Sequence, residues 1–299
     1  MKNKNFKIFF LILVLIFILY LLAITLRSSL IFKKKDRLNL VFYDKSSRFY
    51  SIGFSDGVNY FLSFPSDLKV LVPGGFGYYR LGGLGKLVAL EKDPDIYRKT
   101  FSFLTVSFLD VYFYPKKPEV YFNESKSNMI IKPNLKALLF DKSNVNIFDR
   151  LYLIFLFLQK KPAEFKKIQS LPIIKKSNDL FLDQRRFIDQ ISGFFYQGKI
   201  RKERINVQLI YSNSYKNADL ITKIIEGEGI WVTDISNDLI IKKLSKKPSR
   251  CQIIESNNLN SLTAKYLNTF FNCFLTKGKT EPFDIIFKLG SLENNWAME

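Results

Sequence analysis

The sequence contains no histidine among its 299 residues and only two cysteines. Without histidine there is no Ser-His-Asp triad, no Cys-His pair, no imidazole proton shuttle and no zinc site with a histidine ligand. Two cysteines are too few for a four-cysteine zinc site or an iron-sulfur cluster. Any chemistry therefore has to use carboxylates, arginines, lysines, hydroxyl groups or a metal ion bound by oxygen atoms.

Acidic residues are also scarce. The chain has 27 Asp and Glu against 46 Lys and Arg, which gives a formal net charge of +19. The hydrophobic share of 47% and the aromatic share of 16% are high enough to build a core, so wholesale disorder is excluded. The positive charge is spread along the chain and no nucleic-acid-binding motif accompanies it, which ranks nucleic acid below an anionic lipid or polymer as the partner.

One long hydrophobic run stands near the amino terminus. Residues Ile8 to Leu26 form 19 uncharged positions, enough for a helix of roughly 28 Å, about one hydrocarbon core. A signal peptide has a shorter apolar stretch and a cleavage site with small residues, so a retained single transmembrane helix is predicted. The positive-inside rule leaves its orientation open, because lysines and arginines flank both ends: Lys2, Lys4 and Lys7 before it, and Arg27, Lys33, Lys34, Lys35 and Arg37 after it.

A second apolar run, Leu151 to Leu158, has only eight residues and is too short to cross a bilayer. Because it is apolar on all sides, it predicts a helix or strand deep in a soluble core. Asp149, just before it, suits the positive end of a helix dipole.

After the basic stalk, the runs 38–43, 48–54 and 58–64 are β-rich and separated by hairpin-like turns, which predicts an antiparallel meander that 68–72 continues as a fourth strand. Eight of the 14 glycines then fall between Gly53 and Gly85, a composition typical of a ligand-binding loop. Helices are predicted over 84–91, 95–104, 135–140, 147–160 and 183–197, with a strand over 110–114.

From Ile205 onward, strands and helices alternate, which predicts a small α/β domain with two βαβ-like units. The charged segment KIRKER at 199–204 is typical of a domain boundary. The predicted fold class is therefore α/β in three parts: a membrane anchor and stalk over 1–37, a mixed α/β domain over 38–200, and a small α/β domain over 201–299.

Two groups of residues resemble one known family. The segment FLSFPSDLKV at 61–70, followed by PGG at 73–75 and YRL at 79–81, is similar to the "SIPRD" strand end and following loop of LytR-CpsA-Psr (LCP) proteins. The segments INVQLIYSNS at 205–214 and FDIIFKLG at 283–290 resemble the opening and closing strands of the LytR carboxy-terminal domain. The resemblance covers most of the chain from Leu38.

The resemblance implies an extracytoplasmic protein on a single plasma-membrane helix. The family transfers a glycopolymer from a polyprenyl pyrophosphate carrier to peptidoglycan, using arginines, a carboxylate and a divalent cation such as Mg²⁺. Its catalytic residues correspond here to Asp67 and Arg80, with Arg48, Gly74, Gly75 and Gly77 as ligand-binding candidates. No particular residues are predicted as metal ligands.

Ser66 stands where the family motif has an arginine. Losing one phosphate clamp costs roughly two decades of rate when the clamp acts in the transition state. The prediction is a degenerate site that binds a lipid phosphate, a glycan or a wall partner with weak or no catalysis. The alternative is an active phosphotransferase. Each residue also has a plainer interpretation: Asp67 as a turn cap and Arg80 as a solvated loop charge.

Cys251 and Cys273 fall within one predicted strand-helix unit. A bridge between them would fit an oxidising compartment and contribute about 3 kcal/mol in the chain-entropy model. Two buried thiols acting as small hydrophobic groups fit the sequence equally well.

Overall fold

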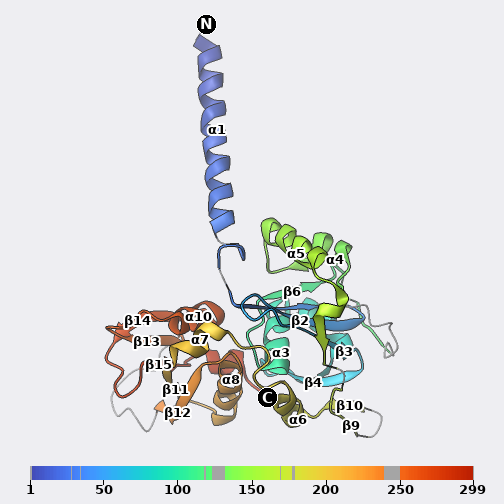
Figure 1. The fold of residues 1–299 in the computed structure, drawn as a ribbon. Coiled ribbons are helices and arrows are strands. Elements are labelled where there is room, and N and C mark those ends of the chain that lie inside the picture. The colour runs from blue at the N-terminus through green and yellow to red at the C-terminus, as the bar shows by residue number, and fades with distance from the viewer. Residues whose placement is uncertain are drawn as a thin grey trace.

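The computed structural model describes residues 2–27, 29–33, 35–117, 119–122, 132–168, 170–176, 179–238 and 250–298. One long helix stands apart from a two-lobed body (Figure 1). This helix, α1 (Lys2–Arg27), contains the apolar stretch Ile8–Arg27, which is long and apolar enough to cross a membrane and has no side chain of that window buried in the protein.

The first lobe contains two sheets. A six-stranded sheet has the order β7-β6-β1-β2-β3-β8 and a four-stranded sheet the order β5-β4-β10-β9. The strands of the first sheet are β1 (Arg37–Phe42), β2 (Ser46–Gly53), β3 (Asn59–Pro65), β6 (Val111–Tyr114), β7 (Lys142–Ser143) and β8 (Phe165–Lys167). Those of the second are β4 (Leu68–Val72), β5 (Gly77–Arg80), β9 (Ile173–Lys176) and β10 (Asp179–Leu182).

Helices cover both faces of the six-stranded sheet. The helices of this lobe are α2 (Leu84–Glu91), α3 (Asp95–Thr105), α4 (Leu135–Phe140), α5 (Ile147–Gln159) and α6 (Gln184–Ile191). Alternate strand residues divide between two cores. Val41, Phe49 and Leu62 pack with residues of α3 and β4, whereas Leu40, Tyr50 and Phe61 pack under α4 and α5.

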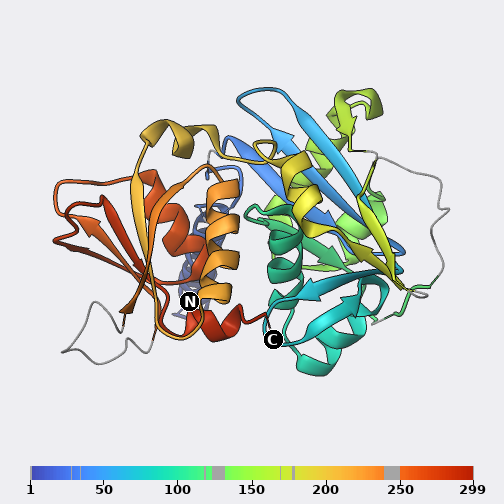
Figure 2. The ribbon, with the colours of Figure 1, turned by 90° about the horizontal axis from the view of Figure 1, so that it is seen from below.

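The second lobe is built on a five-stranded sheet of order β12-β11-β15-β13-β14. Its strands are β11 (Asn206–Tyr211), β12 (Trp231–Asn237), β13 (Gln252–Ser256), β14 (Phe274–Gly278) and β15 (Ile285–Lys288). The helices α7 (Gly198–Glu203), α8 (Tyr215–Gly227), α10 (Leu262–Phe271) and α11 (Leu292–Asn295) accompany it. Figure 2 shows this lobe beside the first, with α8 and α3 facing each other across the junction.

The predicted fold class is confirmed: mixed α/β, with an amino-terminal apolar helix and a further α/β sheet at the carboxy-terminal end. The meander of the first three strands is also confirmed, since β2 pairs antiparallel with both β1 and β3. The predicted fourth strand exists as β4, but it does not continue the meander as predicted, because it belongs to the other sheet. After Pro65 the chain turns out of the sheet, β4 pairs with β5 and β10, and β8 occupies the edge beside β3.

The run 151–158 is helical, but it does not lie deep in the core as predicted. Leu153, Leu156 and Phe157 are buried, whereas Leu151, Phe155 and Leu158 are exposed. Asp149 does lie in the first turn of α5, where the Asn146 side chain caps the helix. The hydrophobicity of this segment therefore exceeds what its packing inside the protein requires.

Candidate functional site

The turn between β3 and β4 carries the first candidate residue, Asp67. Its neighbour Ser66 is buried, and the Ser66 carbonyl accepts a hydrogen bond of 2.7 Å from the Gly82 amide. Gly82 is required here, because a Cβ atom would lie 2.1 Å from the Tyr121 carbonyl oxygen. The position of the missing arginine is thus buried and held by a backbone contact to Gly82.

Arg80, at the end of β5, shares a carboxylate with Lys69 of β4. The Arg80 Nη2 lies 2.7 Å from one oxygen of Asp179, and the Lys69 Nζ lies 2.6 Å from the other. These two contacts lower the pKa of Asp179, the Lys69 hydrogen bond most strongly. The pKa of Arg80 is raised, first by its hydrogen bond to Asp179 and to a smaller extent by the charge of Asp67. The structure therefore brings the predicted residues Asp67 and Arg80 into electrostatic reach of each other.

Strand register shows which side chains share the outer face of the four-stranded sheet. Lys69 is opposite Arg80 on one side and Phe181 on the other, and Asp179 is opposite Lys176. Directly paired residues project on the same face, and residues two apart along a strand do so as well. Tyr78, which is exposed and meets the Phe181 ring edge-on at 5.6 Å, belongs to this face. We call Lys69, Tyr78, Arg80, Lys176, Asp179 and Phe181 the cationic sheet face.

The cationic sheet face combines three cations, two aromatic rings and one carboxylate. The Nζ atoms of Lys69 and Lys176 lie 5.6 and 5.9 Å from the centre of the Phe181 ring. Cations near an aromatic face are attracted by its quadrupole. The strands β4, β9 and β10 lie at the end of the body opposite to α1 (Figure 1).

Arg48 belongs to a different place. It is opposite Phe42 in the register of β1 and β2, so it projects on the sheet face covered by α4 and α5. Its side chain is mostly buried, forms an ion pair with Asp44 and donates to the Lys132 carbonyl at 3.5 Å. Arg80 and Asp67 flank β4, which packs against the other face of the six-stranded sheet. Arg48 and Arg80 therefore lie on opposite sides of that sheet.

The predicted glycine-rich ligand loop contacts the end of the chain. The amides of Gly74 and Gly75, both at positive φ, donate to the carbonyl of Ala297 at 2.8 and 3.0 Å. Gly77, also at positive φ, begins β5 opposite Val72. Two of the amides available to a phosphate group are therefore already used to hold the carboxy-terminal segment.

The divalent cation implied by the sequence resemblance does not fit the residues at this site. Asp179 is occupied by two cations, and Asp67 is the remaining carboxylate close to Arg80. In the described part of the chain, no three acidic or cysteine side chains converge in a metal-binding group.

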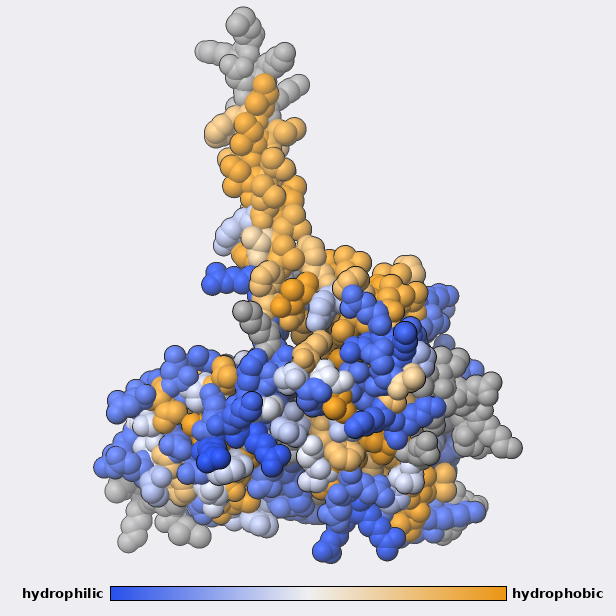
Figure 3. Space-filling model, viewed as in Figure 1, coloured by the Kyte–Doolittle hydropathy of each residue, from blue (hydrophilic) through white to orange (hydrophobic). Residues whose placement is uncertain are grey.

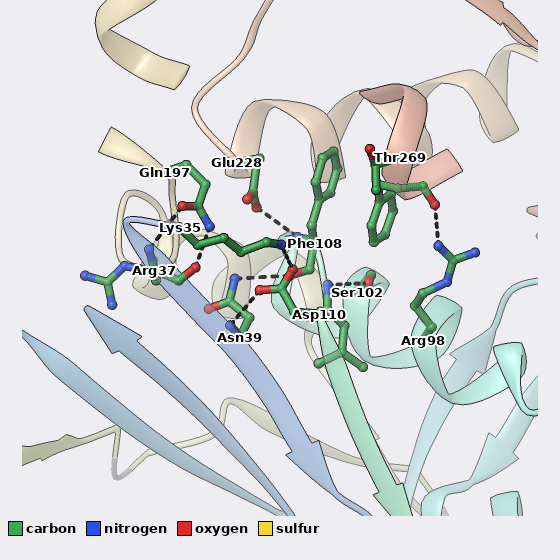
Figure 4. A network of polar contacts seen from close by, with 12 residues as sticks. Lys35, Arg37, Asn39, Arg98, Ser102, Phe108, Asp110, Gln197, Glu228 and Thr269 are labelled. Carbon is green, nitrogen blue, oxygen red and sulfur yellow. Dashed lines mark hydrogen bonds and ion pairs between the residues drawn. The ribbon is translucent and has the colours of Figure 1, made fainter. Parts of the chain in front are cut away.

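A buried polar network joins the stalk to both lobes (Figure 4). The Gln197 side chain accepts from the Arg37 amide at 3.1 Å and donates to the Arg37 carbonyl at 2.7 Å. The backbone N–H of Gln197 donates to the Glu228 carbonyl at 3.0 Å. The Glu228 carboxylate accepts from the Phe108 amide at 2.9 Å. Burial, followed by the nearby charge of Asp110, raises the pKa of Glu228 to about 8.

Sequence reasoning missed Lys69, Lys176 and Asp179, and it also missed Glu228. Lys69 and Asp179 are 110 positions apart and meet only because β4 pairs with β10. Glu228 carried a weak local signal, since it is a single acid between Gly227 and Gly229 at the end of a helix.

The cysteines Cys251 and Cys273 are joined by a disulfide, and they are the residues immediately before β13 and β14. Both sulfur atoms are buried, and both lie near the Phe271 carbonyl. The bridge closes the unit β13-α10-β14 at its base.

Among known proteins, this chain is similar to solved structures only, and it matches none by sequence. No family model matches the chain, and no curated protein matches it. A crystal structure of TagT from Bacillus subtilis matches 52% of this chain and 89% of its own, at 12% identity and a TM-score of 0.36. TagU from the same organism matches 52% and 94%, at 8% identity and a TM-score of 0.37.

A third structure is the LytR-CPS2A-psr family protein YwtF (TagT) with bound octaprenyl pyrophosphate lipid, which matches 52% of this chain and 87% of its own, at 12% identity and a TM-score of 0.35. The similarity to proteins of this family therefore spans about half of the chain. At these identities and TM-scores it does not specify a function.

Proposed function

We propose that this chain is a single-pass, membrane-anchored protein of the cell envelope whose extracytoplasmic body binds a phosphate-bearing glycan or wall polymer without transferring it. The helix α1 supplies the anchor, because its apolar stretch of 20 residues has the length of a bilayer core and its most apolar window has no buried side chain. The LCP-like resemblance of the sequence, with one helix before an external domain, agrees with this layout.

The cationic sheet face is the observation that carries the proposal. Lys69, Arg80 and Lys176 present positive charge at the end of the body away from α1, where the headgroups of the anchoring membrane do not reach. Exposed aromatic rings such as Tyr78 can pack against the apolar faces of sugars while the cations pair with phosphates. A sugar-phosphate polymer offers both groups.

Weak or absent transfer follows from the turn at 66–67. Ser66 is packed against Gly82, so the second guanidinium of the family motif has no counterpart there. With a single arginine beside Asp67, a developing charge on phosphate is poorly stabilised. Binding needs only the ground-state contacts and can persist.

An active phosphotransferase is the second candidate. It is favoured by one observation, the electrostatic reach between Asp67 and Arg80. In that case Asp67 would polarise the acceptor hydroxyl and Arg80 would hold the phosphate. The two candidates make the same binding prediction and differ in turnover.

The binding proposal can be tested with poly(glycerol phosphate) and the full chain in nanodiscs of zwitterionic lipid. Arg80→Gln and Lys176→Gln should each weaken binding roughly two- to fivefold, in line with exposed charge pairs. The matched control is Lys223→Gln, since Lys223 is an exposed lysine that pairs with Asp219 at 2.6 Å on α8 of the other lobe. Equal losses in all three variants would contradict a local site.

Competition separates the sources of phosphate. If the site recognises phosphate on a polymer, then inorganic pyrophosphate and geranylgeranyl pyrophosphate should compete equally. A much stronger effect of the prenylated compound would instead indicate a lipid-phosphate site.

A further inference from the structure

The helix α5 has an apolar side that nothing in the described part of the chain covers. Ile147, Leu151, Phe155 and Leu158 are all exposed and are spaced so that they follow one side of the helix. Phe155 and Leu158 each expose 59% of their surface. A helix on the surface of a soluble protein normally carries polar residues on its outer side. An exposed apolar stripe of this kind indicates a surface that binds another molecule or a membrane.

The short helix α4 extends the apolar surface. Its exposed residues Leu135, Leu139 and Phe140 add to the stripe of α5. A hydrogen bond links the two helices, since the Arg150 Nη1 of α5 donates to the Leu138 carbonyl of α4 at 2.7 Å. We call these seven residues of α4 and α5 the α4–α5 face.

The α4–α5 face lies beside the base of α1. The Asn146 side chain at the start of α5 donates to the Thr25 carbonyl at 3.3 Å, and the Leu30 amide donates to Asp149 at 2.6 Å. These contacts place the start of α5 where the apolar stretch of α1 ends, at Arg27. Figure 3 shows the hydrophobic surface of α1 continuing onto this corner of the body, whereas the opposite end is largely hydrophilic.

Charge around the face favours one occupant, an anionic bilayer. Residues 135–161 contain five lysines and arginines against two aspartates. Asp149 is buried and bound to the Leu30 amide. Lys136, Lys142 and Lys161 are exposed and lie close to the apolar residues in the sequence. Interfacial helices combine an apolar side with basic residues at its border in this way, because the basic groups attract anionic headgroups.

We propose that the α4–α5 face inserts into the interface of the anionic bilayer that α1 enters, as a second membrane contact. This inference rests on α1 being a membrane anchor. Two contacts, one spanning and one interfacial, fix the tilt of the body. They hold the cationic sheet face on the side away from the membrane.

Single-cysteine labelling tests the inference on the full chain. Both native cysteines form the disulfide and the described residues contain no free thiol, so one introduced cysteine can be labelled alone. Phe155→Cys reports on the α4–α5 face and Leu15→Cys on α1. Gln190→Cys, on the exposed surface of α6 far from α1, is the control. The probe is an environment-sensitive NBD label in vesicles of phosphatidylcholine and phosphatidylglycerol containing nitroxide lipids.

The expected result is strong nitroxide quenching at positions 155 and 15 and none at 190, with quenching at 155 severalfold weaker when phosphatidylglycerol is left out. Quenching at 15 with none at 155 would overturn the interfacial contact and leave the anchor standing. No quenching at either position would overturn both. Protection of the label at 155 from aqueous iodide without nitroxide quenching would overturn the proposal in favour of self-association.

Discussion

At the scale of single residues, Asp179 decides how much positive charge the cationic sheet face offers. It binds Lys69 and Arg80 at once, and these contacts keep its pKa low. Any anion that binds here has to compete with this carboxylate. Asp179 thus neutralises part of the positive charge of this face.

Replacing Asp179 by asparagine should therefore strengthen binding of poly(glycerol phosphate) by about two- to fivefold, the range of an exposed ion pair. The dissociation constant of the full chain in nanodiscs measures this at low salt, where screening is weakest. The matched control is Asp219→Asn, which releases Lys223 on α8. Unchanged or weaker binding of the Asp179 variant would mean that its two cations do not contact the polymer.

Glu228 is the second residue with a measurable consequence. Its folded-state pKa of about 8 lies above the ordinary value of 4.5, so the folded protein retains a proton that the unfolded chain has lost. The contribution of Glu228 to stability should then be complete below its ordinary pKa and be lost as the pH rises toward 8, with a slope of up to about 1.4 kcal/mol per pH unit. Glu228→Gln removes this titration.

The prediction is that the melting temperature of the native chain falls more steeply between pH 5.5 and pH 8.5 than that of Glu228→Gln. Thermal unfolding followed by circular dichroism at several pH values checks this. Parallel profiles for the two proteins would show that Glu228 keeps its ordinary pKa in the folded state.

The sequence indicated Asp67 and Arg80 because both lie in one short motif around a turn. The sequence could not indicate Asp179, since its partners Lys69 and Arg80 lie 110 and 99 positions earlier on β4 and β5, and pairing between β4 and β10 leaves no local trace. Gly74 and Gly75, two of the clustered glycines, adopt positive φ. Their amides meet Ala297, a contact over more than 200 residues that composition does not reveal.

At the scale of elements, the spacing of hydrophobic residues predicts strands and helices correctly where one face of an element is buried and the next element follows closely. The strands and helices predicted after Ile205 are present from β11 to β15. In β14 the apolar residues Phe274 and Leu275 are exposed, so this strand has no pattern of one buried face. The misplacement of β4 has another cause. Hydrophobic alternation predicts a strand but not the sheet that it joins, and Pro65 ends the pairing with β2.

The disulfide between Cys251 and Cys273 gives a prediction at this scale. Its removal in Cys251→Ser/Cys273→Ser should lower the free energy of unfolding of the full chain by about 3 kcal/mol. In protein isolated from intact cells, the thiols should be alkylated only after reduction, as expected for an oxidising compartment. Free alkylation of both thiols in the native protein would contradict the bridge and the extracytoplasmic location together.

At the scale of the whole molecule, the apolar and the cationic surfaces lie at opposite ends. Apolar residues of α1 and of the α4–α5 face gather at one end, and the cationic sheet face lies at the other. The buried network around Gln197 and Glu228 connects the stalk to both lobes, so the anchor, the junction and the sheet are linked through a few hydrogen bonds. This arrangement suits a protein that presents a binding surface away from its membrane.

Turnover of a polyprenyl-pyrophosphate-linked glycan by the full chain in proteoliposomes tests the central claim most directly. Release of polyprenyl phosphate is measured for the native chain and for Asp67→Ala, with binding of the same glycan followed in parallel. The account predicts that both proteins bind the glycan and that neither releases polyprenyl phosphate above the rate of empty vesicles. Release by the native chain that disappears in Asp67→Ala would contradict it and establish a phosphotransferase.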